Sequence, residues 1–190
     1  GGDLSAQSRI ALIYYSGIGM DTDYQKARYW FKAAAEQGHI NALYMLGLIH
    51  LNGFGVEEDA RIAANYLKQA SDKGDAPAQA LLAGLYVEGR GVEQDYIMAK
   101  GLFSKASAQD DANGQFGLGT LYHQGYGVPQ DYAEAMRYYQ KATTKGHKDA
   151  HYNIAMMLEI GEGVQQNTAE ARKWYEAAAN LGDPHAAYRL

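Results

Sequence analysis

Apolar residues and glycines recur along the chain with a fixed period of 36 residues. In the segment ALYMLGLIHLNG, Ala42, Leu46 and Ile49 stand at helical spacing, and the pattern stops at Gly53. A glycine at a helix end favours the left-handed backbone conformation that a Cβ would strain. We therefore predict that five first helices end at Gly17, Gly53, Gly89, Gly125 and Gly161, each followed two residues later by a further glycine.

A second helix is predicted after each glycine loop, because an Asp or Asn stands where the helix needs a cap. These side chains accept hydrogen bonds from the free N–H groups of the first turn. Beyond the cap, small and large residues alternate on one face, as at Ala27, Trp30 and Ala34, which lets antiparallel helices interdigitate. The caps are Asp23, Asp59, Asp95, Asp131 and Asn167, and the units close at Gly38, Gly74, Asp110, Gly146 and Gly182.

A fixed period of this size marks a solenoid, in which each unit buries its apolar face only against its neighbours. We predict an all-α fold, an α/α superhelical solenoid of five helix-hairpin repeats, that forms a single domain over residues 1–190. Only the start of a sixth repeat follows, so we expect Trp174 and Tyr175 to lack cover and to promote end-to-end self-association. The repeats span about 6–41, 42–77, 78–113, 114–149 and 150–185, with 186–190 opening the sixth.

These units resemble the Sel-one-like repeat (SLR) family, which is related to the tetratricopeptide repeat proteins. ALLAGLYVEGRGVEQDYIMAKGLF and GLGTLYHQGYGVPQDYAEAMRYYQKA carry its pattern, and the resemblance covers about residues 6–190. Departures are local, since His50 and Leu158 replace the usual Tyr and Asp110 replaces a closing Gly. The resemblance implies a non-enzymatic adaptor or scaffold that binds a protein or peptide, often in bacterial envelope, signalling or host-contact settings. Some disulfide-bridged members are associated with β-lactam or cell-wall-like ligands, so a small-ligand binder with at most weak hydrolase activity is the alternative.

The amino-acid composition limits the kinds of partner that we expect the chain to bind. The net charge is −5 and no run of Lys or Arg stands out, which disfavours nucleic acid. No window approaches 18 consecutive apolar residues, so we expect no membrane insertion. The absence of cysteine excludes disulfides, thiol catalysis and Cys-based zinc sites. Bacterial periplasm or envelope and cytoplasm both stay open as compartments.

No catalytic or metal-binding group is predicted. The Gly-x-Gly loops lack the third glycine and the preceding strand that a dinucleotide site requires. His147 and His151 stand four residues apart without an HExxH pattern, and His147 occupies a helix-cap position, so we expect structural or solvated histidines. Neither S-x-x-K nor K-T-G occurs. We expect no catalytic residue, no metal and no cofactor.

The partner surface is expected on the first helices, which line the concave face in related tetratricopeptide stacks. The inward positions lie two, six, nine and ten residues after the first small residue of each repeat, and they combine aromatic, aliphatic and amide side chains with few charges. Such a surface suits an extended peptide. Packing against the neighbouring first helix is the alternative for the aromatic members. The candidate residues are Tyr15, Tyr44, Leu48, Leu51, Asn52, Glu88, Phe116, His123, Gln124, Tyr152 and Glu159.

Overall fold

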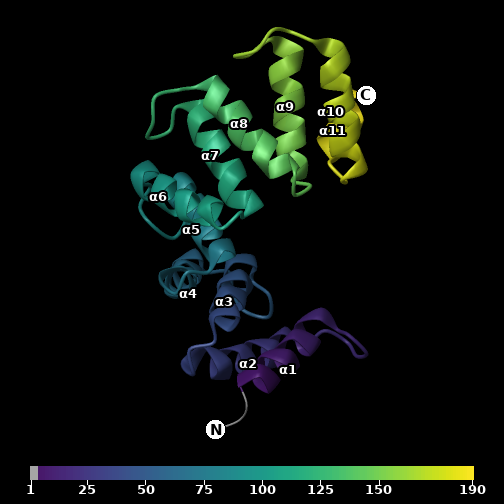
Figure 1. Cartoon of the computed structure of the whole chain (residues 1–190). Helices are drawn as coiled ribbons and strands as arrows, with labels where there is room; N and C mark the ends of the chain where they lie inside the picture. Colours follow the sequence, from purple (N-terminus) through teal and green to yellow (C-terminus); the bar gives the residue numbers. More distant parts are fainter. Residues whose placement is uncertain (1–3) are drawn as a thin grey trace. The chain divides into compact units, whose positions relative to one another are not determined.

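The computed structural model describes residues 4–190, and the regular elements in this range are all helices (Figure 1). Its contacts divide the chain after Asp95 into an N-terminal and a C-terminal unit, which we describe separately. Over the described residues, no helix combines the length and the apolarity needed to cross a bilayer. The N-terminal unit contains α1 (Leu4–Ser16), α2 (Tyr24–Glu36), α3 (Ile40–Asn52), α4 (Ala60–Asp72) and α5 (Ala76–Glu88). The C-terminal unit contains α6 (Tyr96–Ala108), α7 (Ala112–Gln124), α8 (Tyr132–Thr143), α9 (Lys148–Ile160), α10 (Thr168–Asn180) and α11 (Pro184–Arg189).

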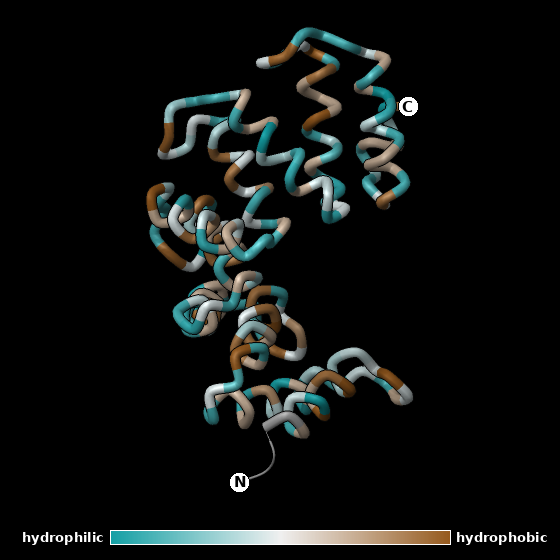
Figure 2. The backbone as a smooth tube through the Cα atoms, viewed as in Figure 1, coloured by the Kyte–Doolittle hydropathy of each residue, from teal (hydrophilic) through white to brown (hydrophobic). Residues whose placement is uncertain are grey.

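Successive helices within each unit pack on one another. The pairs α1–α2, α3–α4, α7–α8 and α9–α10 form the hairpins, and α2–α3, α4–α5, α6–α7 and α8–α9 join neighbouring repeats. Figure 1 shows α9 and α10 side by side. In Figure 2 brown, hydrophobic segments run along α9, whereas α10 alternates between teal and paler segments. The all-α repeat of helix hairpins that the sequence predicts is confirmed.

The helix ends follow the predicted chemistry. Gly53 ends α3 with φ of 68°, and its N–H donates to the carbonyl oxygen of Ile49. Asp110 closes the third repeat with φ of 62° and is the only non-glycine with positive φ among the described residues. At the start of α4, Asp59 Oδ1 accepts hydrogen bonds from the N–H groups of Arg61 and Ile62. Asp23, Asp131 and Asn167 cap α2, α8 and α10 in the same manner.

In each second helix, the residue that follows the large residue at the position of Trp30 is buried. Ala27, Phe31 and Ala34 are fully buried, whereas Trp30 is half-buried. Residues at i, i+4 and i+7 form one helical stripe, so Phe31 faces the partner helix while Trp30 lies at the edge of the stripe. The buried side chains at this position are Phe31, Leu67, Phe103, Tyr139 and Tyr175.

Neighbouring repeats interlock at the glycine loops. Phe54, the middle residue of one loop, stacks on Tyr24 at the start of the preceding second helix, with ring centroids 5.0 Å apart. A Cβ on the following Gly55 would lie 2.8 Å from the Tyr24 Cβ, which is too close. In the C-terminal unit Tyr126 stacks on Tyr96 in the same way, at 4.8 Å. The second glycine of the loop therefore permits close approach between repeats.

The short helix α11 covers the end of the fifth repeat. Ala186 is fully buried against α10, and Tyr175 is only 3% exposed. Our expectation that Tyr175 lacks cover is therefore wrong, because its ring packs against Tyr152 of α9 and belongs to the buried cluster that also contains Ala186 of α11. Trp174 remains half-buried and lies 5.5 Å from the His151 ring. Self-association through this end stays a prediction.

Candidate functional site

Packing leaves one row of side chains on each first helix partly exposed. In α3 the row consists of Tyr44, Leu48 and Asn52, which stand four residues apart, while Leu46 and Ile49 between them are buried. Side chains at this spacing follow one line along a helix. We call the row the first-helix ridge, and it consists of Leu12 and Ser16 on α1, Tyr44, Leu48 and Asn52 on α3, Gly84 and Glu88 on α5, Phe116, Thr120 and Gln124 on α7, and Tyr152, Met156 and Ile160 on α9.

The ridge residues at the C-terminal ends of α1, α3, α5 and α7 are polar and exposed, namely Ser16, Asn52, Glu88 and Gln124. Asn52 Nδ2 donates to the carbonyl oxygen of Leu48 at 2.8 Å, and within the described residues its Oδ1 accepts no hydrogen bond. Gln124 is exposed and its amide is bonded to no other described residue. Glu88 occupies the corresponding place on α5. Amide hydrogen-bonding groups therefore face solvent on two first helices.

The aromatic members of the ridge are half-buried. Phe116 stacks on the His147 ring, with centroids 4.4 Å apart, and also packs against Tyr139 at 5.6 Å. Tyr152 meets the Tyr175 ring edge to face at 5.5 Å. Part of each ring is thus used for packing within the unit, and part stays accessible.

The residues predicted at the ninth position of the first helices lie off the ridge. Leu51 is buried, and its carbonyl oxygen accepts a hydrogen bond from Arg90 Nη2 at 3.1 Å. Tyr15 packs edge to face against Phe54 at 6.0 Å. Arg90 and Phe54 are the middle residues of the next repeat's glycine loops, so the ninth position joins neighbouring repeats.

His123 is the most extensively bonded member of this set. It is buried, with Nδ1 3.2 Å from the Tyr139 hydroxyl and Nε2 2.8 Å from Glu162 Oε2. The hydrogen bond from His123 lowers the pKa of Glu162, and the Tyr132 hydroxyl adds a second hydrogen bond. This network ties α7 and α8 to the loop after α9. Comparing residues 39 positions apart in the sequence would have paired His123 with Glu162.

Glu159 also has partners within the C-terminal unit. Its Oε2 accepts a hydrogen bond from the Tyr175 hydroxyl at 2.7 Å and lies 3.5 Å from Arg189 Nη1. Burial and this carboxylate raise the pKa of Tyr175. Glu159 therefore has a structural role in α9, α10 and α11.

His147 at the end of the fourth repeat and His151 at the start of the fifth are structural. His147 Nδ1 accepts a hydrogen bond from the Ala150 N–H at 3.3 Å and so caps α9. His151 Nδ1 lies 2.9 Å from the carbonyl oxygen of His147. Within the described range, no group of three or more His, Asp or Glu side chains is placed to hold a metal ion.

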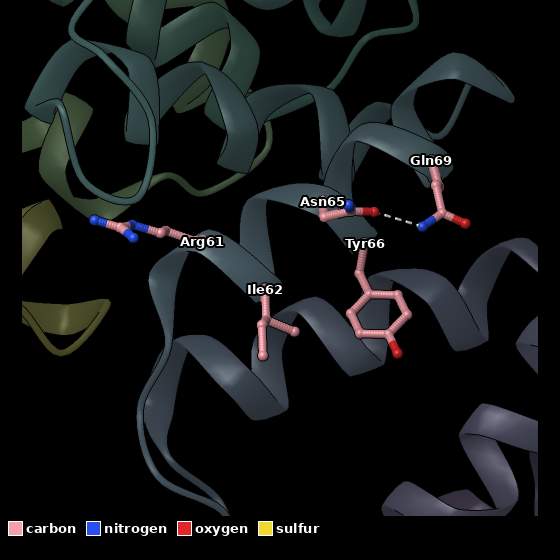
Figure 3. Close-up of a pocket in the computed structure, with 5 residues that line it drawn as sticks. All are labelled: Arg61, Ile62, Asn65, Tyr66 and Gln69. Carbon is pink, nitrogen blue, oxygen red and sulfur yellow. Dashed lines mark hydrogen bonds between the residues drawn. The ribbon is translucent and has the colours of Figure 1, made fainter.

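A shallow pocket that sequence reasoning missed lies on α4 in the N-terminal unit. Its volume is about 440 Å³. Figure 3 shows Ile62 and Tyr66 on the same side of α4, Arg61 pointing away from them, and the 2.7 Å hydrogen bond between Asn65 and Gln69. The repeat pattern marks Tyr66 as the large residue equivalent to Trp30, but it does not point to a pocket on the outer side of a second helix.

Interlocking helix hairpins with a recurrent exposed ridge define a helical-repeat protein. The Sel1 repeat family matches the chain five times, in frames that begin two residues before those predicted from the sequence. The chain therefore belongs to the Sel1 repeat family, whose solenoids generally serve as scaffolds for protein interaction. The matched residues are 4–39, 40–75, 76–111, 112–147 and 148–183.

Solved structures show the same fold. A protective antigen of uropathogenic Escherichia coli strains with an SLR fold is 36% identical, with a TM-score of 0.85 over 97% of this chain. This chain spans only 40% of the length of that antigen. A Sel1 repeat protein from Oxalobacter formigenes is 29% identical, with a TM-score of 0.89, and the match covers 99% of this chain and 77% of that one.

A third solved structure is cysteine rich protein B of Helicobacter pylori. It is 27% identical, with a TM-score of 0.56, and the match covers 67% of this chain and 96% of that one. No curated protein matches the chain significantly.

Proposed function

We propose that this chain is a non-enzymatic scaffold, and that the part of the first-helix ridge within each unit binds an extended segment of a protein partner. The observation that carries the proposal is that α3, α7 and α9 leave the same row of residues partly or fully exposed, while most of the residues beside the row are buried. An extended segment needs polar groups for its backbone and apolar surface for its side chains. The ridge offers both, with amides at Asn52 and Gln124 and rings at Tyr44, Phe116 and Tyr152.

The half-buried rings favour binding because they are already ordered. Phe116 is fixed between His147 and Tyr139, and Tyr152 is fixed by Tyr175. A ring that is held in place before binding loses little conformational entropy when a ligand covers it. Aromatic side chains of this kind supply much of the binding energy in protein interfaces.

The test uses a partner captured from the organism of origin and titrated calorimetrically against ridge variants. We expect Asn52→Ala and Gln124→Ala each to cost about 1 kcal/mol, roughly a fivefold loss of affinity, with unchanged helicity. Gln140→Ala is the matched control, because Gln140 is an exposed amide on the second helix α8. Unchanged affinity in both ridge variants would refute the proposal.

Hydrogen exchange separates an extended segment from a small ligand. An extended segment slows exchange along several first helices. Protection restricted to one helix pair would instead support a small-molecule site of the cell-wall or β-lactam type.

A further inference from the structure

Two pockets in the N-terminal unit join into one groove along the outer side of α4. The larger pocket, of about 440 Å³, extends along α4 from Arg61 to Gln69. The smaller pocket, of about 140 Å³, lies between α2 and α4, and Tyr66 and Gln69 line both pockets. The two pockets are therefore continuous. We call the surface that they form the α2–α4 groove, which consists of Lys32, Ala35 and Glu36 on α2, Leu43 on α3, and Arg61, Ile62, Asn65, Tyr66 and Gln69 on α4.

The middle of the groove is apolar and accessible to solvent. Ile62 is 41% exposed, and Tyr66 on the same side of α4 is half-buried (Figure 3). The Tyr66 ring is held in place, because it stacks on the His50 ring with centroids 5.8 Å apart. A ligand side chain that covers Ile62 and Tyr66 therefore removes apolar surface from water without having to order the ring.

Two other second helices carry a carboxylate where α4 carries Ile62. These residues are Glu134 on α8 and Glu170 on α10. Each forms an ion pair with the residue three positions later, at 2.6 Å to Arg137 and at 3.4 Å to Lys173. The repeat thus accommodates a solvated ion pair at this place, so packing within the repeat does not require Ile62. The apolar middle of the groove is a feature that distinguishes α4 from α8 and α10.

Cationic side chains flank the apolar middle. Arg61 lines only the larger pocket and Lys32 only the smaller one, so they stand on opposite sides of the two shared residues. Both are exposed, and neither forms an ion pair with any described residue. The nearby Asp59 carboxylate is engaged in capping α4, and Glu36 is the one acid that lines the groove. The whole chain has a net charge of −5, so this excess of positive charge is local.

The length of the groove indicates the spacing of a matching ligand. Arg61 and Gln69 are eight residues apart on one helix, which corresponds to about 12 Å along its axis. In an extended chain the side chains at i, i+2 and i+4 point to the same side and span about 13 Å. Carboxylates at i and i+4 therefore match the separation of the two cationic ends, and the side chain at i+2 falls on the apolar middle.

We propose that the α2–α4 groove binds an extended acidic segment of a protein partner, with carboxylates four residues apart and an aliphatic residue midway between them. The aliphatic side chain packs on Ile62 and Tyr66. The carboxylates pair with Arg61 and Lys32, whose exposed charges have no other ion-pair partner among the described residues. The groove lies on second helices and the ridge on first helices, so each site can fail its test without the other.

The experiment titrates the chain with the capped peptide acetyl-Glu-Ala-Leu-Ala-Glu-amide and follows the Ile62 methyl and Tyr66 ring signals by NMR. We expect saturable shifts of both signals and an affinity that falls as salt is added. Two control peptides separate charge from spacing. Acetyl-Gln-Ala-Leu-Ala-Gln-amide lacks the carboxylates, and acetyl-Glu-Glu-Leu-Ala-Ala-amide places them side by side, so both should bind at least fivefold more weakly. No saturable response to the first peptide, or equal binding of either control, would overturn the proposal.

Charge variants locate the carboxylates. Arg61→Gln and Lys32→Gln should each weaken binding of the first peptide at least fivefold. Both should fold, because the repeat already carries glutamine at the equivalent positions, Gln25 and Gln140. Lys105→Gln on α6 is the matched control, since it removes one exposed charge from a second helix outside the groove, and it should leave binding unchanged. An unchanged affinity in Arg61→Gln or Lys32→Gln, or an equal loss in Lys105→Gln, would place the carboxylates elsewhere.

A pair of variants at Ile62 tests the apolar contact. Ile62→Glu introduces the residue type of Glu134, so it should fold, and its charge should abolish binding of the acidic peptide. Ile62→Leu keeps the apolar surface and should bind as the parent does. Circular dichroism verifies that both variants retain their helix content. Peptide binding that survives Ile62→Glu would refute the assignment of the groove.

Discussion

His123 Nε2 lies 2.8 Å from Glu162 Oε2, across 39 residues of sequence and one repeat boundary. Leu51 and Arg90 are also 39 residues apart, and the Leu51 carbonyl oxygen accepts a hydrogen bond from Arg90 Nη2. In each case a residue near the end of a first helix touches the middle residue of the next repeat's glycine loop. The backbone geometry of the repeat sets this pairing, and the side chains decide how strong it is.

Glu162→Gln should destabilise the C-terminal unit by about 1 kcal/mol at pH 7, because it removes a charge-assisted hydrogen bond to a buried histidine. The pKa of Glu162 is lowered in the folded state, so its stabilisation is present above the unfolded pKa. It is lost as the pH falls through the folded pKa. Urea unfolding should therefore show a difference in unfolding free energy between the parent chain and Glu162→Gln that is smaller at pH 3 than at pH 7. Glu93→Gln, at an exposed loop residue, is the control and should change little.

Gly127→Ala should destabilise the chain more than Gly19→Ala. Both glycines have positive φ, so both variants carry backbone strain of about 1 kcal/mol or more. A Cβ on Gly127 would also lie 2.7 Å from the Tyr96 Cβ, whereas a Cβ on Gly19 meets nothing within 4 Å. Thermal unfolding of the two variants measures the difference. Equal midpoints would contradict the role assigned to the second loop glycine.

Gly89→Val and Gly84→Ala should change stability in opposite directions. Gly89 ends α5 with φ of 67°, so a β-branched residue there should cost about 1–3 kcal/mol. Gly84 lies within α5, and a Cβ at that position meets no atom within 4 Å. Alanine there should add about 0.5–1 kcal/mol through helix propensity. Chemical denaturation of both variants measures whether the free energy of unfolding falls in Gly89→Val and rises in Gly84→Ala.

His147→Asn should make the chain less sensitive to mild acid. His147 accepts a hydrogen bond as the cap of α9, and burial lowers its pKa in the folded state. As the pH falls below the unfolded pKa of about 6.5, the unfolded chain binds a proton that the folded chain resists, so stability declines. Asparagine also caps helices but does not titrate. The unfolding midpoint should fall less in the variant than in the parent chain when the pH is lowered from 7.5 to 5.5. An identical fall in both would contradict the role of His147.

Most of the local structure follows from the sequence. The period, the glycines with positive φ and the Asp and Asn caps depend on backbone conformation and on hydrogen bonds within a few residues. Asp110 departs from the closing glycine of the other repeats, yet it adopts the same positive-φ conformation, because the repeat geometry requires that conformation at this position. The exposed row of Tyr44, Leu48 and Asn52 likewise follows from helical spacing.

The tertiary structure decided which of these positions face a neighbour. Tyr15, Leu51 and His123 fit a ligand surface by spacing, yet each contacts the loop of the next repeat. Likewise, the α2–α4 groove forms only when α2, α3 and α4 are packed together. Helical periodicity determines the face on which a side chain lies, whereas its contacts depend on how closely the next hairpin approaches, and that distance is set by packing between residues far apart in the chain.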